Sequence, residues 1–165
     1  MKTYFLVLIS GLIFPLGFAP FNAWPVTIIS LSCIIYLLNN SLSRSSFLSG
    51  YIYGLGLWGA GISWMFVSIY YHGNVGLISS ILIILFLIAF LSIFTGLVAF
   101  LYKTFKINNN SFNCLVIFPA IWVLVEIIRS NIFSGFPWLI IGDSLAGTHF
   151  GGWIPILGVF GGSII

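Results

Sequence analysis

The chain alternates long apolar segments with short polar ones, a pattern typical of membrane-spanning helices. Each of the first five segments ends at a polar or proline-containing stretch, and a further segment begins near Trp153. A helix needs about 20 apolar residues to cross the hydrocarbon core of a bilayer. The pattern therefore predicts an all-α integral membrane protein with five transmembrane helices and the start of a sixth. The five predicted helices cover Tyr4–Phe18, Val26–Leu38, Phe47–Tyr70, Leu77–Leu101 and Phe112–Arg129.

Composition excludes a water-soluble domain. The sequence is 61% hydrophobic and only 4% charged, whereas soluble domains carry about 25% charged residues. No charged residue occurs between Arg44 and Lys103. The few cations are scattered and form no basic patch, so a nucleic-acid partner is not expected.

The cations predict the orientation in the membrane. Lys2, Arg44, and the pair Lys103 and Lys106 fall on alternate connections, hence on one side. Cytoplasmic connections carry an excess of Lys and Arg, so we expect a bacterial inner-membrane protein with a cytoplasmic N-terminus. The region Ser130–Gly152 then faces the periplasm.

Two features of the chain do not indicate additional chemistry. The N-terminal Lys and apolar run are typical of a signal peptide, but no small-residue cleavage site follows, so we interpret them as a retained first helix. Cys33 and Cys114 lie in apolar runs without further ligands at metal-like spacing. We expect no disulfide, metal or other cofactor.

Glu126 and Arg129 are the charged residues inside a predicted span. They lie three positions apart and so share a helix face, in the last turns before the predicted periplasmic surface. Ionisable residues within spans are costly and are usually functional or partnered. Two interpretations stay open: contact with a lipid headgroup or substrate, or a self-neutralising pair that holds the fifth helix to its neighbours.

The sequence "GFPW" interrupts the helical pattern after Arg129. Gly135 permits a helix-ending turn, and Phe136, Pro137 and Trp138 supply wide apolar faces and an indole donor. Irregular backbone at membrane depth must be buried in protein or line a cavity. This periplasmic Gly/Pro/aromatic loop is therefore either packed against other spans or the floor of a lipid-contacting cavity.

The third apolar segment combines glycines and aromatic residues. Gly50 and Gly54 form a small-xxx-small pair, and Gly59 and Gly61 extend it, so we expect close helix packing there. Trp64, from the same segment, is a further candidate for lipid contact beside Glu126, Arg129 and the "FPW" residues.

Several stretches together are characteristic of one known family. They are "LGFAPFNAWP" (Leu16–Pro25), "GLGLWGAGISWMFVSI" (Gly54–Ile69), "PAIWVLVEIIR" (Pro119–Arg129), "SGFPWLIIGDS" (Ser134–Ser144) and "PILGVFGGS" (Pro155–Ser163). In this order and spacing the sequence resembles the N-terminal membrane domain of apolipoprotein N-acyltransferases, and the resemblance covers essentially residues 1–165.

The resemblance implies an activity and its substrates. Such enzymes transfer an acyl chain from a membrane phospholipid to the N-terminal diacylglyceryl-cysteine of a lipoprotein, with a Glu base, a Lys and a Cys nucleophile in a periplasmic nitrilase-type domain. Those residues have no counterpart here, and Glu126 matches a membrane motif with Trp122 and Arg129. We therefore assign no catalytic residue, and expect a truncated chain that is inactive alone or is completed by a separately encoded catalytic domain.

A second class of function is compatible with the same sequence. The chain could be a standalone, non-enzymatic membrane module or a gene remnant that binds lipid or a partner membrane protein. The DNA beyond Ile165 discriminates between these hypotheses, since a nitrilase-like reading frame favours the acyltransferase. A transporter is disfavoured because the sequence contains no internal repeat.

Overall fold

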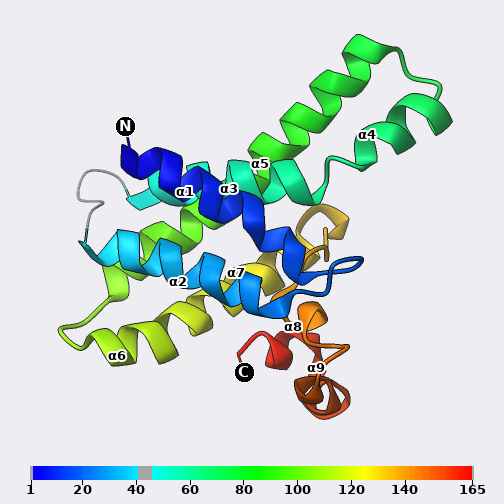
Figure 1. Cartoon of the computed structure of the whole chain (residues 1–165). Helices are drawn as coiled ribbons and strands as arrows, with labels where there is room; N and C mark the ends of the chain where they lie inside the picture. The colour runs from blue at the N-terminus through cyan, green and yellow to red at the C-terminus, as the bar shows by residue number, and fades with distance from the viewer. Residues whose placement is uncertain (1, 41–45, 165) are drawn as a thin grey trace.

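The computed structural model describes residues 2–40 and 46–164, and the described part is all-helical without strands. Helix α3 (Ser46–Gly61) lies between α1 (Lys2–Ile13) and α5 (Leu77–Phe105) and makes its most extensive contacts with these two. Helix α2 (Trp24–Asn40) lies beside α1, and α7 (Phe118–Asn131) packs against α5 (Figure 1).

Among the described residues, two helices are long and apolar enough to cross a membrane, or three if a bent pair counts as one span. The two are α5 and the continuous helical stretch Asn110–Asn131, made of α6 (Asn110–Phe112), the π-helix η3 (Asn113–Ile117) and α7. Pro119 lacks an N–H and would clash with the carbonyl four residues earlier in a regular helix. A π-helical turn, η3, lies just before it, and π-helix occurs mostly as such single turns inside α-helices.

The first two predicted spans form shorter helices than a full crossing. Helix α1 continues into the 3-10 helix η1 (Phe14–Gly17), with Pro15 in its first turn. Helix α2 begins at Trp24 and includes Pro25, although we expected the proline to precede the helix. Proline fits the first helical turn because the N–H groups there have no partner within the helix.

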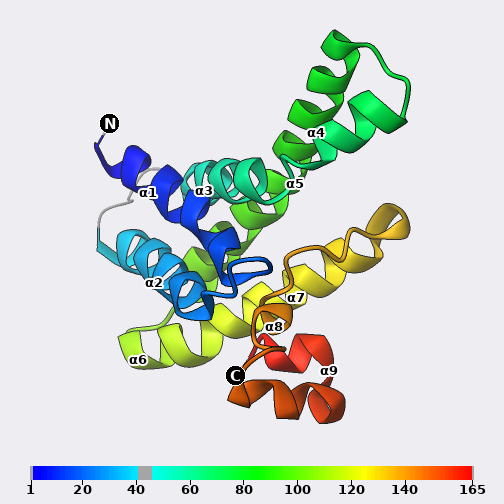
Figure 2. The ribbon, with the colours of Figure 1, turned by 45° about the vertical axis from the view of Figure 1, so that its right-hand side comes forward.

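The third predicted span, Phe47–Tyr70, is not one continuous helix. Helix α3 ends at Gly61, and α4 (Met65–Val67) with the π-helix η2 (Ser68–His72) follows at an angle of 59°. Glycine weakens a helix interior, and Gly61 lies so close to Leu139 that a Cβ would approach its Cδ1 to 2.3 Å. Both views show α4 and the first part of α5 projecting away from the other helices (Figures 1 and 2).

The sixth predicted span, beginning near Trp153, is also interrupted. The 3-10 helix η5 (His149–Trp153) leads into α9 (Ile154–Gly162), where Gly158 has a φ of 72° and breaks the helical conformation. The described segment is thus too short and too irregular to be one crossing helix. Arg44, used for the orientation, and Ile165, the predicted end of this span, lie outside the described residues.

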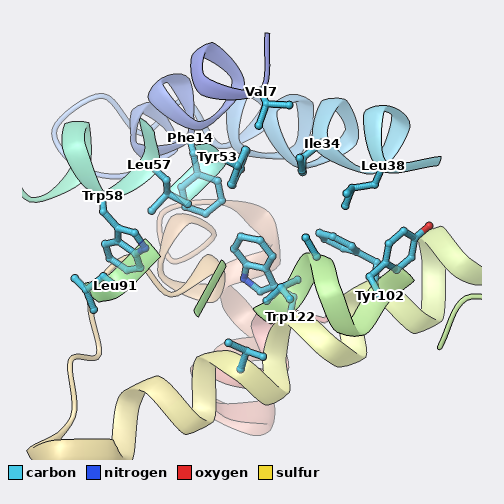
Figure 3. Close-up of a cluster of buried hydrophobic side chains, with 14 of the residues drawn as sticks. Val7, Phe14, Ile34, Leu38, Tyr53, Leu57, Trp58, Leu91, Tyr102 and Trp122 are labelled. Atoms are coloured by element: carbon cyan, nitrogen blue, oxygen red, sulfur yellow. The ribbon is translucent and has the colours of Figure 1, made fainter. Parts of the chain in front are cut away.

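Aromatic residues and hydroxyl groups hold the helices together. The ring of Trp122 lies at the centre of the core, with its centroid 5.9 Å from that of Phe14 and 6.4 Å from that of Tyr53 (Figure 3). The hydroxyls of Tyr53 and Ser30 are 2.7 Å apart, and Thr27 Oγ1 donates to Phe14 O over 3.0 Å. Such hydrogen bonds link helices where no water competes for the same groups.

The ends of the helices gather at two ends of the bundle. Lys103 Nζ donates to Leu38 O over 2.7 Å, so the C-terminal ends of α2 and α5 meet. Helix α1 runs alongside α2, and its first residues lie at the same end of the bundle (Figures 1 and 2). We call this end of the bundle the basic end. We call the other end of the bundle the loop end. It contains η1, the start of α2 and the segment after α7.

Candidate functional site

The segment after α7 forms a tight irregular loop. The 3-10 helix η4 (Ile132–Ser134) contains Phe133 with a φ of 51°, and Gly135 follows with a φ of 80°. A Cβ on Gly135 would lie 2.1 Å from Ser130 O, so the turn requires glycine. Leu139 also has a positive φ, 53°. Non-glycine residues in this conformation persist only where their surroundings hold them.

Arg129 holds the first part of this loop. Its Nη1 donates to the carbonyl oxygens of Phe136 and Trp138, the latter over 2.9 Å, and its own carbonyl accepts from the Phe136 N–H over 3.1 Å. The guanidinium carbon lies 4.8 Å from the ring centroid of Trp58. These contacts fix the backbone on both sides of Pro137.

Glu126 holds the end of the same loop. Its Oε1 accepts from Trp122 Nε1 over 2.9 Å and from the Ile141 N–H over 3.0 Å. Ile141 begins the short helix α8 (Ile141–Ser144). Glu126 and Arg129 are only 3% and 4% exposed. The spacing of the two residues left a self-neutralising pair open as one interpretation; in the described part of the chain their side-chain hydrogen bonds go to the loop and to Trp122.

A groove of about 720 Å³ lies at the loop end. Three stretches that are far apart in the sequence line it: residues 12–22, residues 60–64 and the segment 137–147. Trp64 and Trp138 form one aromatic wall, with ring centroids 5.3 Å apart, and are 51% and 43% exposed. The groove therefore combines parts of three of the motifs that carry the family resemblance.

The structure separates the predicted site residues into two groups. Trp64, Pro137 and Trp138 line the groove. Phe136 points to the interior, with its ring centroid 6.1 Å from that of Trp58. Together with Glu126 and Arg129 it supports the groove from behind, so lipid contact by these three residues stays a prediction.

The four glycines of the third segment have different surroundings. A Cβ on Gly50 or Gly54 would come within 2.4 Å of α5, at Thr95 O and Thr95 Oγ1 respectively. Gly61 lies against Leu139 of the loop. A Cβ added to Gly59 would have no heavy atom within 4 Å. Close approach to α5 thus involves the first two glycines.

Sequence reasoning missed three residues of this region. Phe21 and Asp143 line the groove, and Trp58 covers the Arg129 guanidinium. Phe21 could have been identified from its position between two turn-forming residues, since a large apolar side chain in a loop often marks a contact site. The removal of water by the surrounding protein raises the pKa of the Asp143 carboxyl.

Comparison with known proteins assigns the chain to a family. Residues 10–165 match the model of the apolipoprotein N-acyltransferase N-terminal domain. The chain belongs to this family. The match includes both the loop that Glu126 and Arg129 hold and all segments that line the groove.

Several curated proteins of the family are similar over nearly all of this chain. The apolipoprotein N-acyltransferases of Coxiella burnetii and Methylococcus capsulatus are each 37% identical, over 97% and 98% of this chain, respectively. That of Haemophilus influenzae is 36% identical over 96% of it. The matches cover 33%, 32% and 30% of these relatives, so the chain spans about a third of their length.

Proposed function

We propose that this chain is the membrane part of an acyltransferase that completes bacterial lipoproteins. The substrates would be a phospholipid, which donates an acyl chain, and the N-terminal diacylglyceryl-cysteine of a lipoprotein, which accepts it. The observation that carries the proposal is the groove, because it joins three family motifs and exposes aromatic side chains at one end of a membrane bundle.

In this proposal the groove holds the acyl part of a lipid substrate. Leu12, Pro15 and Leu16 line it beside the exposed rings of Trp64 and Trp138. Burial of apolar surface gives about 25 cal/mol per Å², so a long acyl chain gains most of its binding energy from such a lining. Glu126 and Arg129 act as positioning residues, since they fix the backbone that presents Trp138.

In this proposal the chemical steps belong to the part of the relatives that this chain does not match. The relatives are about three times as long as their match to it. The family resemblance implies that this remainder supplies the Glu, Lys and Cys of acyl transfer. The membrane part would then hold lipid substrates below the reacting groups, whether the two parts are one chain or two.

We further propose that the protein crosses the inner membrane five times with a cytoplasmic N-terminus. Lys103 and Lys106 lie at the basic end, which the positive-inside rule places in the cytoplasm. Helix α2 has 17 residues and is therefore about 25 Å long, less than the hydrocarbon thickness of about 30 Å. The groove at its far end would then lie at the level of acyl chains in the outer leaflet.

A hybrid protein tests the proposed function. The chain is joined to the remaining two thirds of the Coxiella burnetii relative, or co-expressed with that part as a separate chain, in cells depleted of their own apolipoprotein N-acyltransferase. We expect at least the fused form to restore N-acylated lipoproteins, detected by mass spectrometry. A hybrid that inserts stably, yet leaves lipoproteins unacylated, would contradict the proposal.

Substitution of Trp138 tests the groove within that hybrid. Trp138→Ala removes one of the two rings of the aromatic wall. It removes no buried hydrogen bond of the side chain, so we expect normal insertion and a loss of acyl transfer of about tenfold, the equivalent of about 1.4 kcal/mol. Trp153→Ala is a matched control, because Trp153 is exposed and does not line this groove. Full activity of Trp138→Ala would exclude a substrate role for this indole.

A further inference from the structure

The side chains of Trp58 and Glu126 each bury one polar atom that has no hydrogen-bond partner among the described residues. These atoms are Nε1 of Trp58 and Oε2 of Glu126. The two residues are only 2% and 3% exposed. Ser163 acts electrostatically on the same carboxyl, but its hydroxyl forms no hydrogen bond with Oε2. Buried polar atoms are costly without a partner, and an ordered water often satisfies those that the protein does not.

A small internal cavity brings the two residues together. Trp58 comes from α3 and Glu126 from α7, and both line the cavity. The volume open to the centre of a water-sized sphere is about 20 Å³. A cavity needs about 10–15 Å³ on this measure to hold one water molecule. The cavity therefore has room for a single water and is too small for a lipid chain.

The polar groups around the cavity complement a water molecule. The indole N–H of Trp58 can only donate a hydrogen bond, and the carboxylate oxygen of Glu126 can only accept one. Thr95, on α5, lines the same cavity. Its hydroxyl donates to Ser92 O over 2.9 Å, and its oxygen keeps lone pairs that can accept. One donor and two acceptors give a water three partners, the usual number for a buried water.

The other residues around the cavity favour a neutral ligand. Arg129 lines it as well, with its guanidinium carbon 4.8 Å from the ring centroid of Trp58. A cation in the cavity would be repelled by this guanidinium, and an anion by the Glu126 carboxylate. The N–H of Trp122 already donates to Glu126 Oε1 over 2.9 Å. The remaining lining side chains of the described residues are apolar.

We propose that one water molecule occupies this cavity and joins α3, α5 and α7. The water accepts from Trp58 Nε1 and donates to Glu126 Oε2 and Thr95 Oγ1. Glu126 Oε1 binds the Ile141 N–H, so the water fixes the second oxygen of the carboxylate that holds the loop. The inference gives the indole nitrogen of Trp58 a use that a phenyl ring could not supply. It depends neither on the lipid groove nor on acyl transfer.

Nuclear magnetic resonance of the indole groups tests the site. The full chain is labelled with ¹⁵N in its six tryptophans and studied in detergent micelles. Trp58→Phe identifies the signal of residue 58 by removing it. A bound water gives the indole proton cross-peaks of opposite sign in nuclear Overhauser and rotating-frame spectra, whereas hydrogen exchange with bulk water gives peaks of the same sign.

We expect the bound-water cross-peak at Trp58 in the wild-type chain. Thr95→Val keeps the shape of the side chain and should retain about half or more of the peak, since two partners of the water remain. Val125→Ile adds a methyl group to the lining of the cavity and should weaken the peak at least about fivefold, because the methyl group takes the space of the water.

A matched control and a second filling variant complete the set. Val116→Ile lies in the same helical stretch as Val125 but is exposed and does not line the cavity, so the peak should not change. Val98→Ile fills the cavity from α5 and replaces Val125→Ile if that variant does not fold.

Three results would overturn the proposal. The first is a wild-type chain without a bound-water peak at Trp58. The second is complete loss of the peak in Thr95→Val, which would assign the peak to the hydroxyl proton of the threonine. The third is an unchanged peak in a filling variant whose helical content matches wild type, which would place the water outside this cavity. The measurement involves no lipid substrate and no acyl transfer, so this proposal and the proposed function fail separately.

Discussion

The basic end and the loop end of the bundle differ in how they use charged residues. At the basic end, Lys103 contacts the end of α2 and remains partly open to solvent, as does Lys106. At the loop end, Glu126 and Arg129 are buried and bind the backbone of residues 136–141. Charges at the first end can orient the protein in the membrane, whereas charges at the second end determine the shape of a loop.

The difference shows what a membrane protein gains from a buried charge. Taking a charge out of water costs several kcal/mol unless hydrogen bonds compensate for it. Backbone carbonyls and N–H groups of an irregular loop need partners for the same reason. Around Glu126 and Arg129 the two requirements are met together for Glu126 Oε1, the Arg129 guanidinium and the loop groups that they bind, although Glu126 Oε2 has no hydrogen-bond partner within the described part of the chain.

Removal of Arg129 should produce the largest change. Arg129→Leu eliminates the bonds to Phe136 and Trp138 and leaves Glu126 as a buried charge without a nearby cation. We expect a loss of about 3–5 kcal/mol in the free energy of unfolding. Arg129→Lys keeps the charge but not the planar group that reaches two carbonyls, and should recover only part of the loss.

Unfolding in mixed micelles, followed by circular dichroism, measures these effects. Lys106→Leu is the matched control at the basic end and should change stability by less than about 0.5 kcal/mol. If the two Leu variants were equally stable, the contrast between the ends would be wrong.

Glycine substitutions in α3 should have the next largest effect. A Cβ at residue 54 would come within 2.0 Å of Thr95 Oγ1 and 2.8 Å of Ser92 Cα. Gly54→Ala should therefore cost about 1–3 kcal/mol through overpacking against α5. Gly59→Ala meets open space and should be neutral or stabilise by up to about 1 kcal/mol.

The same unfolding assay compares the two alanine variants. If Gly59→Ala lowered the free energy of unfolding as much as Gly54→Ala, tight packing between α3 and α5 would not be the cause of the destabilisation.

Asn113 provides a neutral counterpart of Arg129 near the basic end. Its side chain accepts from the Ile107 N–H over 2.9 Å and donates to Ile107 O over 2.7 Å. Asn113→Ala should cost about 1 kcal/mol, because the freed groups of Ile107 can reach water. Hydrogen exchange at residues 106–109 should accelerate in this variant while exchange in the segment 136–141 does not change. Faster exchange in both segments would show that the two ends are not independent.

Lys103 should have the smallest effect on stability. Its partly buried hydrogen bond to Leu38 O should contribute about 0.5 kcal/mol, because water can take the place of this flexible side chain. Lys103→Gln combined with Lys106→Gln should instead increase the fraction of molecules inserted in the opposite orientation, measured with a reporter fused to the C-terminus. An unchanged orientation would show that these lysines do not set the topology.

The sequence alone predicted the regular parts of the molecule well. The predicted start of the fourth apolar segment, Leu77, is the first residue of α5. Hydropathy identifies such a helix because every turn is apolar. It cannot detect the break after Gly61, because Ile62 and Trp64 are as apolar as the helix before them.

The arrangement of the candidate site was less accessible from the sequence. The spacing of Glu126 and Arg129 predicts a shared helix face, and the two residues do lie together. It does not reveal that carbonyls and an N–H of a later segment are the partners, because backbone groups are identical at every position. Asp143 lies only five residues beyond Trp138, but its place in the groove depends on the positive φ of Leu139.

The two anchor points of the loop also constrain how this protein can vary in length. Arg129 and Glu126 lie on one rigid helix, and they bind the loop at residue 138 and at residue 141. One inserted residue between these points would move Ile141 away from Glu126 by up to about 3.5 Å, more than a hydrogen bond can follow. In the described residues, no pair of side chains from one helix binds the backbone of the connection before Gly76 in this way. Insertions of foreign sequence should therefore be tolerated around Asn74, whereas the irregular segment 138–141 has little freedom to change its length.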